Sequence, residues 1–241
     1  MARIGAPSIR RQRLRAKPVM KTSSFGTSED ESGKAGAIMA ALDWAYDKAV
    51  NGIPKLDRAE DLAENYIVKA RSPEEAIDSL VTWQIGKAGV AGFVSNVGGV
   101  ITLPVAIPAN VMSVLWIQIR MVAAIAHIRG FNIRSDQVKT LVLACLAGTS
   151  TTDVLKDFGI NVGSKLTQQA IGKISGATLR RINQAVGFRL ITKAGTTGAV
   201  NLSRIVPFLG GLVGGSIDAT ITRAIGMAAK NLFNNQVPES A

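Results

Sequence analysis

The feature that most restricts the fold of this chain is a run of 32 residues without a charged side chain, Ala88–Ile119, in a protein of net charge +11. An apolar segment of this length is what a bilayer-spanning helix requires. A Gly-Gly pair at 98–99 and prolines at 104 and 108 divide it into two helical pieces, each short for a span. The sequence therefore predicts a central glycine-rich apolar helical hairpin. This hairpin either forms the core of a soluble helical bundle or enters the lipid.

Helical patterns account for the rest of the ordered chain, and no alternation of apolar and polar residues is long enough for a strand. Ser72, Pro73 and Glu75 form a capping-box pattern that starts one helix, and Asp57 is placed to cap the helix before it. Ser135 starts a later helix, which follows a glycine C-cap at position 130. We predict an all-α fold with one helical domain at 35–235, preceded by a disordered basic tail and linker at 1–34.

Positive charge is concentrated toward the two ends of the chain. From Phe158 to Gln236 there are nine Lys or Arg residues and one acid, whereas residues 35–86 are net acidic. A basic half beside an apolar segment fits an anionic membrane surface. Aromatic residues do not alternate with the basic positions, and no nucleic-acid-binding motif is present, so we expect no nucleic-acid partner.

The cysteine and histidine content limits the chemistry. Cys145 is the only cysteine and lies in the apolar run TLVLACLAG, which is typical of a core residue. His127 is the only histidine, and neither a CxxC nor an HExxH motif occurs. We therefore expect no metal site and no cofactor.

Three segments carry a resemblance to a known family: the stretch from GFVSNVGGVITLPVAIPANVMSVLWIQIRMVAAIAHIRGFNIRSDQVKTLVLACLAG, then INQAVGFRLITKAG, then VPFLGGLVGGSIDATITRAIGMAAKNLF. In order and spacing they resemble the EcsC family of bacterial proteins, over roughly residues 37–234. The resemblance implies an all-helical, membrane-proximal protein in bacteria. It supplies no catalytic residues that can be assigned to this chain.

Two groups of polar residues interrupt the apolar helices. Asn110, Ser113, Arg120 and His127 fall on one narrow face of the helix that starts after Pro108. A buried arginine is costly unless it is paired, so this face is either a polar site in the bundle or the partner of a carboxylate from another helix.

The second group lies on the last helix, where Asp218, Thr222 and Gly226 share a face. An aspartate there is either a base or cation ligand, or the structural partner of a buried arginine such as Arg120 or Arg189. Overlapping GxxxG patterns at 210–214 and 211–215 predict close packing against another helix.

A third group is basic. Arg180, Arg181, Arg189 and Lys193 lie on one helix, although not on one face of it. They form either an ordinary solvated surface or a patch for phospholipid headgroups.

These features favour a non-enzymatic, membrane-associated protein that binds the cytoplasmic face of the bacterial inner membrane, or a membrane protein, and is either peripheral or partly inserted. Two alternatives stay open. One is a membrane-associated hydrolase with a buried polar site around Asp218, Arg120 and His127. The other is a soluble protein-interaction module. The sequence indicates no oligomeric state.

Overall fold

The structure, a computed structural model, describes residues 28–54, 56–88, 109–162, 166–195 and 211–234. Within these residues every regular element is a helix, and the one β-type contact is an isolated bridge between Ile53 and Leu56. The predicted all-α fold is confirmed. The elements are α1 (Ser28–Asn51), α2 (Ala59–Ile67), α3 (Pro73–Ala88), α5 (Ala109–Ile128), α6 (Asp136–Cys145), η2 (Gly148–Ser150), α7 (Thr151–Lys156), α8 (Gln168–Gly172), α9 (Gly176–Gly195) and α11 (Gly211–Leu232).

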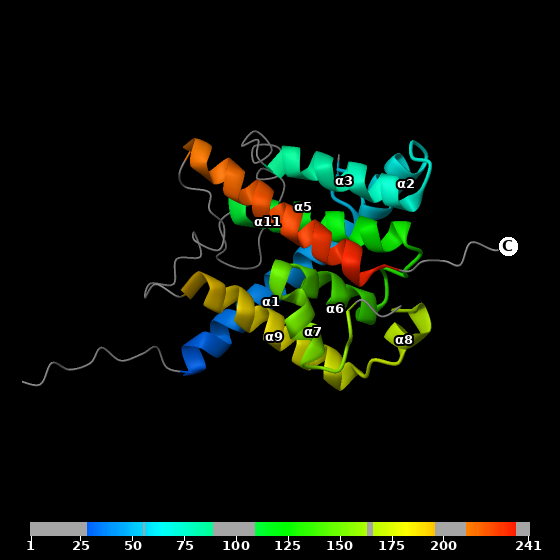
Figure 1. The fold of residues 1–241 in the computed structure, drawn as a ribbon. Coiled ribbons are helices and arrows are strands. Elements are labelled where there is room, and N and C mark those ends of the chain that lie inside the picture. Colours follow the sequence, from blue (N-terminus) through cyan, green and yellow to red (C-terminus); the bar gives the residue numbers. More distant parts are fainter. Residues whose placement is uncertain (1–27, 55, 89–108, 163–165, 196–210, 235–241) are drawn as a thin grey trace, which may run out of the picture.

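Helix α5 is the centre of the fold. It packs against α1, α2, α3, α6 and α11, and Figure 1 shows α11 crossing it in the middle of the molecule. Large apolar side chains on all sides of α5, such as Trp116, Ile119, Met121 and Ile125, are fully buried. A helix that is apolar all round is stable in this position because every side has a neighbour to pack against.

The two sides of the core differ in which helices form them. In Figure 1, α2 and α3 lie at the top, and α8 and α9 lie at the bottom, with α5, α6 and α11 between them. Helix α9 packs on α1, α6 and α7, whereas α3 packs on α5 and α11. The aromatic pair Phe131 and Phe233, with ring centroids 5.2 Å apart, joins the loop after α5 to the end of α11.

The predicted helix ends are mostly found where the sequence placed them. Ser72 Oγ accepts from the Glu75 N–H at 3.2 Å, and Ser135 Oγ accepts from the Val138 N–H at 3.3 Å. Gly130 follows α5 with a φ of 77°, a conformation that favours glycine. The expected cap at Asp57 is wrong. Arg58 occupies the N-cap position of α2, and the Asp61 carboxylate accepts its backbone N–H at 3.1 Å.

Helices α3 and α11 approach each other at Gly226. A Cβ at this position would lie 2.9 Å from a methyl carbon of Val81, closer than real Cβ atoms pack. Glycine is therefore required for this contact. The predicted face of α11 does point inward here, since Thr222 is also buried. The close packing predicted for the GxxxG glycines stays a prediction. Gly210 and the surroundings of Gly211, Gly214 and Gly215 lie outside the described residues.

The start of the helical region differs from the boundary predicted between the linker and the domain. Helix α1 begins at Ser28, so residues 28–34, which the sequence assigns to the linker, are helical. The predicted tail up to residue 27, and residues 89–108 of the predicted apolar hairpin, lie outside the described residues.

Candidate functional site

The polar face predicted on α5 is only partly a buried site. Ser113 and Arg120 are buried, whereas His127 is about one-third exposed at the end of the helix. The side chain of Asn110 lies outside the described residues. The face therefore runs from the interior at Ser113 to the protein surface at His127.

Arg120 makes one hydrogen bond to the backbone. Its Nη1 donates to the Asp57 carbonyl at 3.0 Å, and its guanidinium lies 4.3 Å from the centroid of the Trp116 ring. Burial lowers the pKa of Arg120 to about 10, an effect that the nearby Asp57 and Tyr66 partly oppose. Nε has no hydrogen-bond partner among the described residues.

The expected carboxylate partner of Arg120 is not seen among the side chains that the structure describes. The side chain of Asp218 lies outside them, so a pair between Asp218 and Arg120 stays a prediction. The other member of the α11 group, Thr222, is fully buried and accepts from Gln118 Nε2 of α5 at 3.3 Å.

Sequence reasoning missed two buried glutamines. Gln118 joins α5 to α11 through Thr222. Gln84 of α3 is fully buried, and neither of its amide atoms has a partner in the described part of the chain. A glutamine within an otherwise apolar helical stretch was the available signal for both.

His127 belongs to a different contact. Its Nε2 lies 3.5 Å from Glu64 Oε1 of α2, and both side chains are partly exposed. The described contacts of Arg120, Thr222 and His127 are thus with three different partners, the Asp57 carbonyl, Gln118 and Glu64. Among described side chains, this arrangement does not bring a nucleophile, a base and an orienting acid together, as hydrolysis by a catalytic triad would require.

Ion pairs cluster around α2 and α3. Their acids pair with cations from the α2 N-cap, the loop after α5 and α11, in the pairs Arg58–Asp61, Arg129–Glu74, Arg134–Glu60 and Lys230–Asp78. The Arg129 side chain is almost completely buried, and its Nη1 lies 2.6 Å from Glu74 Oε1. Arg58–Asp61 is local to the start of α2, whereas the other three pairs join α2 or α3 to distant parts of the chain.

Like the polar group on α5, the predicted basic group on α9 has members that differ in how far they are buried. Arg180 and Arg181 are exposed, Arg189 is half-buried, and the side chain of Lys193 lies outside the described residues. Arg180 and Arg181 share the exposed side of α9 with Phe188, which is 51% exposed. The opposite side, with Leu179, Ile182 and Val186, is buried.

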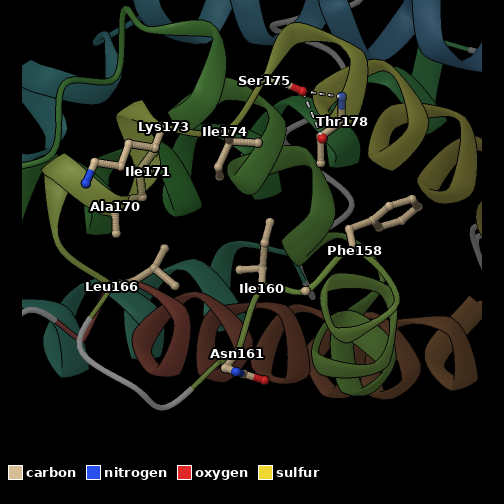
Figure 2. Close-up of a pocket in the computed structure, with 11 residues that line it drawn as sticks. Phe158, Ile160, Asn161, Leu166, Ala170, Ile171, Lys173, Ile174, Ser175 and Thr178 are labelled. Atoms are coloured by element: carbon tan, nitrogen blue, oxygen red, sulfur yellow. Dashed lines mark hydrogen bonds between the residues drawn. The ribbon is translucent and has the colours of Figure 1, made fainter.

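A pocket of about 460 Å³ opens between the loop after α7, α8 and the start of α9 (Figure 2). Phe158, Ile160, Leu166, Ile171 and Ile174 supply its apolar lining. Figure 2 shows the side chains of Ile160, Leu166 and Ile174 pointing into a common space, with Ser175 and Thr178 at one rim. Sequence reasoning did not find this pocket, because it depends on how the loop after α7, the short helix α8 and the start of α9 come together in the fold.

The lining of the pocket also includes polar residues, among them Lys173, Ser175 and Thr178, whereas Arg180 and Arg181 lie outside it. Ser175 Oγ accepts from the Thr178 N–H at 3.2 Å and so caps α9. Lys173 lines the pocket, and the Arg181 guanidinium lies 5.7 Å from the centroid of the Phe158 ring. Arg180 Nη1 would lie 3.8 Å from a Cβ on Gly176, so its head reaches back toward the start of α9.

Comparison with known families identifies the chain. The model of the EcsC protein family matches residues 22–235. The protein belongs to the EcsC family. The match covers most of the chain and confirms the resemblance seen in the sequence. Neither a curated protein nor a solved structure is significantly similar to it.

Three further observations bear on this EcsC-family protein. None of the described helices combines the length and the hydropathy needed to cross a bilayer. The described residues also contain no group of three or more His, Cys, Asp or Glu side chains placed to hold a metal ion. Cys145 is fully buried in the core, and this burial raises the pKa of its thiol.

Proposed function

We propose that this EcsC-family protein is a non-enzymatic, membrane-associated protein that binds an anionic lipid surface through α8 and α9. The setting that we propose is the cytoplasmic face of the bacterial inner membrane, where anionic headgroups and basic protein surfaces meet.

The observation that carries the proposal is that three exposed cations have no described ion-pair partner. Lys173, Arg180 and Arg181 are exposed, and among the described residues none of them has an ion-pair partner. No acid occurs from residue 158 to residue 217. Three such cations on consecutive elements lower the free energy of binding to an anionic surface, and each contributes about 1 kcal/mol.

The apolar component of the same surface is Phe188. An exposed aromatic side chain beside basic residues is typical of helices that lie at a lipid interface, with the ring at the level of the headgroups. Arg181 and Phe188 are seven residues apart on α9, close to two full turns, so they lie along one stripe of the helix. The stripe thus combines charge with apolar area.

Vesicle flotation tests the proposal. The purified protein should float with vesicles that contain phosphatidylglycerol and stay in the dense fraction with phosphatidylcholine alone, and added salt should release it. Replacing Lys173, Arg180 and Arg181 together by Gln should lower the partition coefficient roughly 100-fold, from about 1 kcal/mol per cation.

The matched control removes the same charge elsewhere. Lys69, Arg71 and Arg223 are also exposed, but they lie on the α2, α3 and α11 side. Their replacement by Gln should leave most of the binding intact. Equal losses in both triple variants would show that net charge alone drives binding, and would refute the α8–α9 surface. No flotation with any lipid composition would favour the soluble interaction module.

A further inference from the structure

We infer that residues 235–241, which follow α11, fold back over the pocket beside α8 and cover its apolar lining. In this arrangement Val237 and Pro238 contact the lining, and Glu239 lies beside Lys173. The segment lies outside the described residues, and the match to the family ends at residue 235. The inference goes beyond the proposed function, because it concerns a contact within the chain.

The pocket has apolar surface that the described helices leave uncovered. Leu166 and Ile171 are buried, whereas Phe158, Ile160 and Ile174 are only half-buried although they are large and apolar. Apolar groups that cover such side chains displace water from them, which lowers the free energy. An apolar segment that can reach the lining is therefore stabilised there.

The end of α11 lies close to this pocket. The ring of Phe233 packs on that of Phe131, with ring centroids 5.2 Å apart. The residue before Phe131, Gly130, accepts a hydrogen bond at its carbonyl oxygen from Nε2 of Gln168, the first residue of α8. The loop after α5 therefore contacts both the end of α11 and the start of α8. Figure 1 agrees, since the red end of α11 and α8 both lie at the right of the view.

The segment is long enough to extend past α8. A chain extends by at most about 3.3–3.6 Å per residue, so Pro238 can lie up to about 14 Å from Asn234. This reach exceeds the diameter of one helix with its side chains, about 10–12 Å. The residue before a proline favours an extended backbone, so Val237 and Pro238 form an extended apolar pair. Proline also has little backbone freedom to lose, which lowers the entropic cost of holding the segment in place.

The charge of the segment matches the edge of the pocket. Glu239 is the only acid that follows Asp218, and Lys173 is exposed without an ion-pair partner among the described residues. In Figure 2 the Lys173 amine points away from the cavity, toward the side of the view on which α11 ends. A segment that arrives from α11 thus brings its acid to this amine outside the apolar lining, and its apolar pair to the lining itself.

Disulfide trapping in the full-length protein tests this contact, because the only native cysteine, Cys145, is fully buried. Ala170→Cys with Val237→Cys places one thiol on the lining and one on the segment. The matched control is Gln169→Cys with Val237→Cys, since Gln169 is exposed on α8 beside Ala170 but does not line the pocket. Oxidation rates are divided by the alkylation rates of the thiols, which removes differences in reactivity. The Ala170 pair should cross-link at least about tenfold faster than the Gln169 pair, because docking raises the effective concentration of one thiol at the other.

The ion pair is tested in the same background. Glu239→Gln or Lys173→Gln, added to the Ala170 pair, should each slow cross-linking by up to about fivefold, the size of effect expected for an exposed ion pair. Both changes together should slow it no more than either alone, because they remove the same interaction. Additive effects would show that Glu239 and Lys173 do not meet, and would overturn this arrangement of the segment.

A second readout needs no cysteine. In protein labelled at isoleucine and valine methyl groups, nuclear Overhauser effects should connect Val237 with Ile160 or Ile174, and Val237→Ala should remove them. Equal cross-linking rates for the two thiol pairs, or absence of these effects, would overturn the inference and leave the pocket open to a separate ligand. Lys173 also belongs to the proposed lipid-binding surface, but these experiments contain no lipid, so their results do not depend on that proposal.

Discussion

The charged side chains of α2 and α3 and those of α8 and α9 are arranged in opposite ways. Acids of the first region pair with cations from the loop after α5 and from α11, and one of these cations, Arg129, is almost completely buried. In the second region, Lys173, Arg180 and Arg181 have no ion-pair partner among the described residues. The first arrangement joins helices to one another, whereas the second leaves positive charge available to a ligand.

The distribution of acids along the chain explains this difference. Seven Asp or Glu residues occur from Asp57 to Asp78, and none occurs from residue 158 to residue 217. Arg129, Arg134 and Lys230, which fold against the first region, therefore meet carboxylates, whereas no described carboxylate forms an ion pair with Lys173, Arg180 or Arg181. We accordingly expect substitutions in the first region to change stability, and substitutions in the second to change binding.

The largest expected effect on stability is at the contact that joins the ion-paired region to the core. Because a Cβ at Gly226 would already lie 2.9 Å from Val81, Gly226→Leu should overpack α11 against α3. We expect the free energy of unfolding to fall by about 3 kcal/mol, the upper end of the range for overpacking, as measured by urea denaturation.

Helix α3 offers a control for this substitution. Gly86 lies within the helix, and a Cβ at this position would have no neighbouring atom within 4 Å. Gly86→Ala should stabilise the protein by about 0.5–1 kcal/mol through helix propensity. A neutral Gly226→Leu variant would mean that α3 and α11 can separate at this point without cost.

The second prediction concerns the pair Arg129–Glu74. Glu74→Ala leaves the buried guanidinium without its carboxylate. Full burial of both partners would cost roughly 3–5 kcal/mol, but Glu74 is half exposed, so solvent screening should reduce the loss to about 2 kcal/mol. Replacement of Lys139, whose partner Asp43 is exposed, should cost under about 1 kcal/mol.

This pair should also make stability depend on pH. The hydrogen bond from Arg129 holds the pKa of Glu74 below its usual value of 4.5. A lowered pKa means that the contribution is complete above about pH 4.5 and is lost as the pH falls through the folded-state value. Acid denaturation of Glu74→Ala should therefore show a smaller loss of stability over this range than the wild type. Parallel curves would contradict the assignment.

The sequence was sufficient to predict the helices because local signals decide them. The caps at Ser72 and Ser135 and the terminator at Gly130 depend on a few neighbouring residues, and the all-apolar sides of α5 require burial whatever surrounds them. The position of polar side chains depends instead on which helices meet. Ser113 and Arg120 are buried, but the backbone partner of Arg120 could not be inferred without the position of α2.

The pocket illustrates the same limit. Its lining residues come from the loop after α7, α8 with its flanking residues, and the start of α9, and no pattern in the sequence links them. Lys173 was not among the predicted basic residues, because it lies outside α9. Lys173 lines the pocket, whereas Arg181 approaches only the ring of one lining residue, Phe158.

The third prediction concerns Arg120, a buried cation near α2 that has no described carboxylate partner. Arg120 is buried, yet it has a backbone carbonyl and an aromatic ring as its described partners. Since desolvation of its charge is costly, Arg120→Met should change the free energy of unfolding by no more than about 1 kcal/mol. Arg120→Ala should cost more, because it opens a cavity beside Trp116. A large loss in the Met variant would instead reveal a carboxylate partner, with Asp218 as the first candidate.

The smallest effect on stability should come from the region that we assign to binding. Lys173, Arg180 and Arg181 are exposed and have no described ion pair, so their joint replacement by Gln removes no stabilising carboxylate contact. It does remove the stacking of Arg181 on Phe158, which is worth about 0.5–1 kcal/mol at an exposed site. Relief of repulsion among the three cations should offset part of this loss. The net change in the free energy of unfolding should stay within about 0.5 kcal/mol, the usual range for surface substitutions. A loss of more than about 2 kcal/mol in urea denaturation would show that these cations hold the fold together, and the contrast between the two regions would then be wrong.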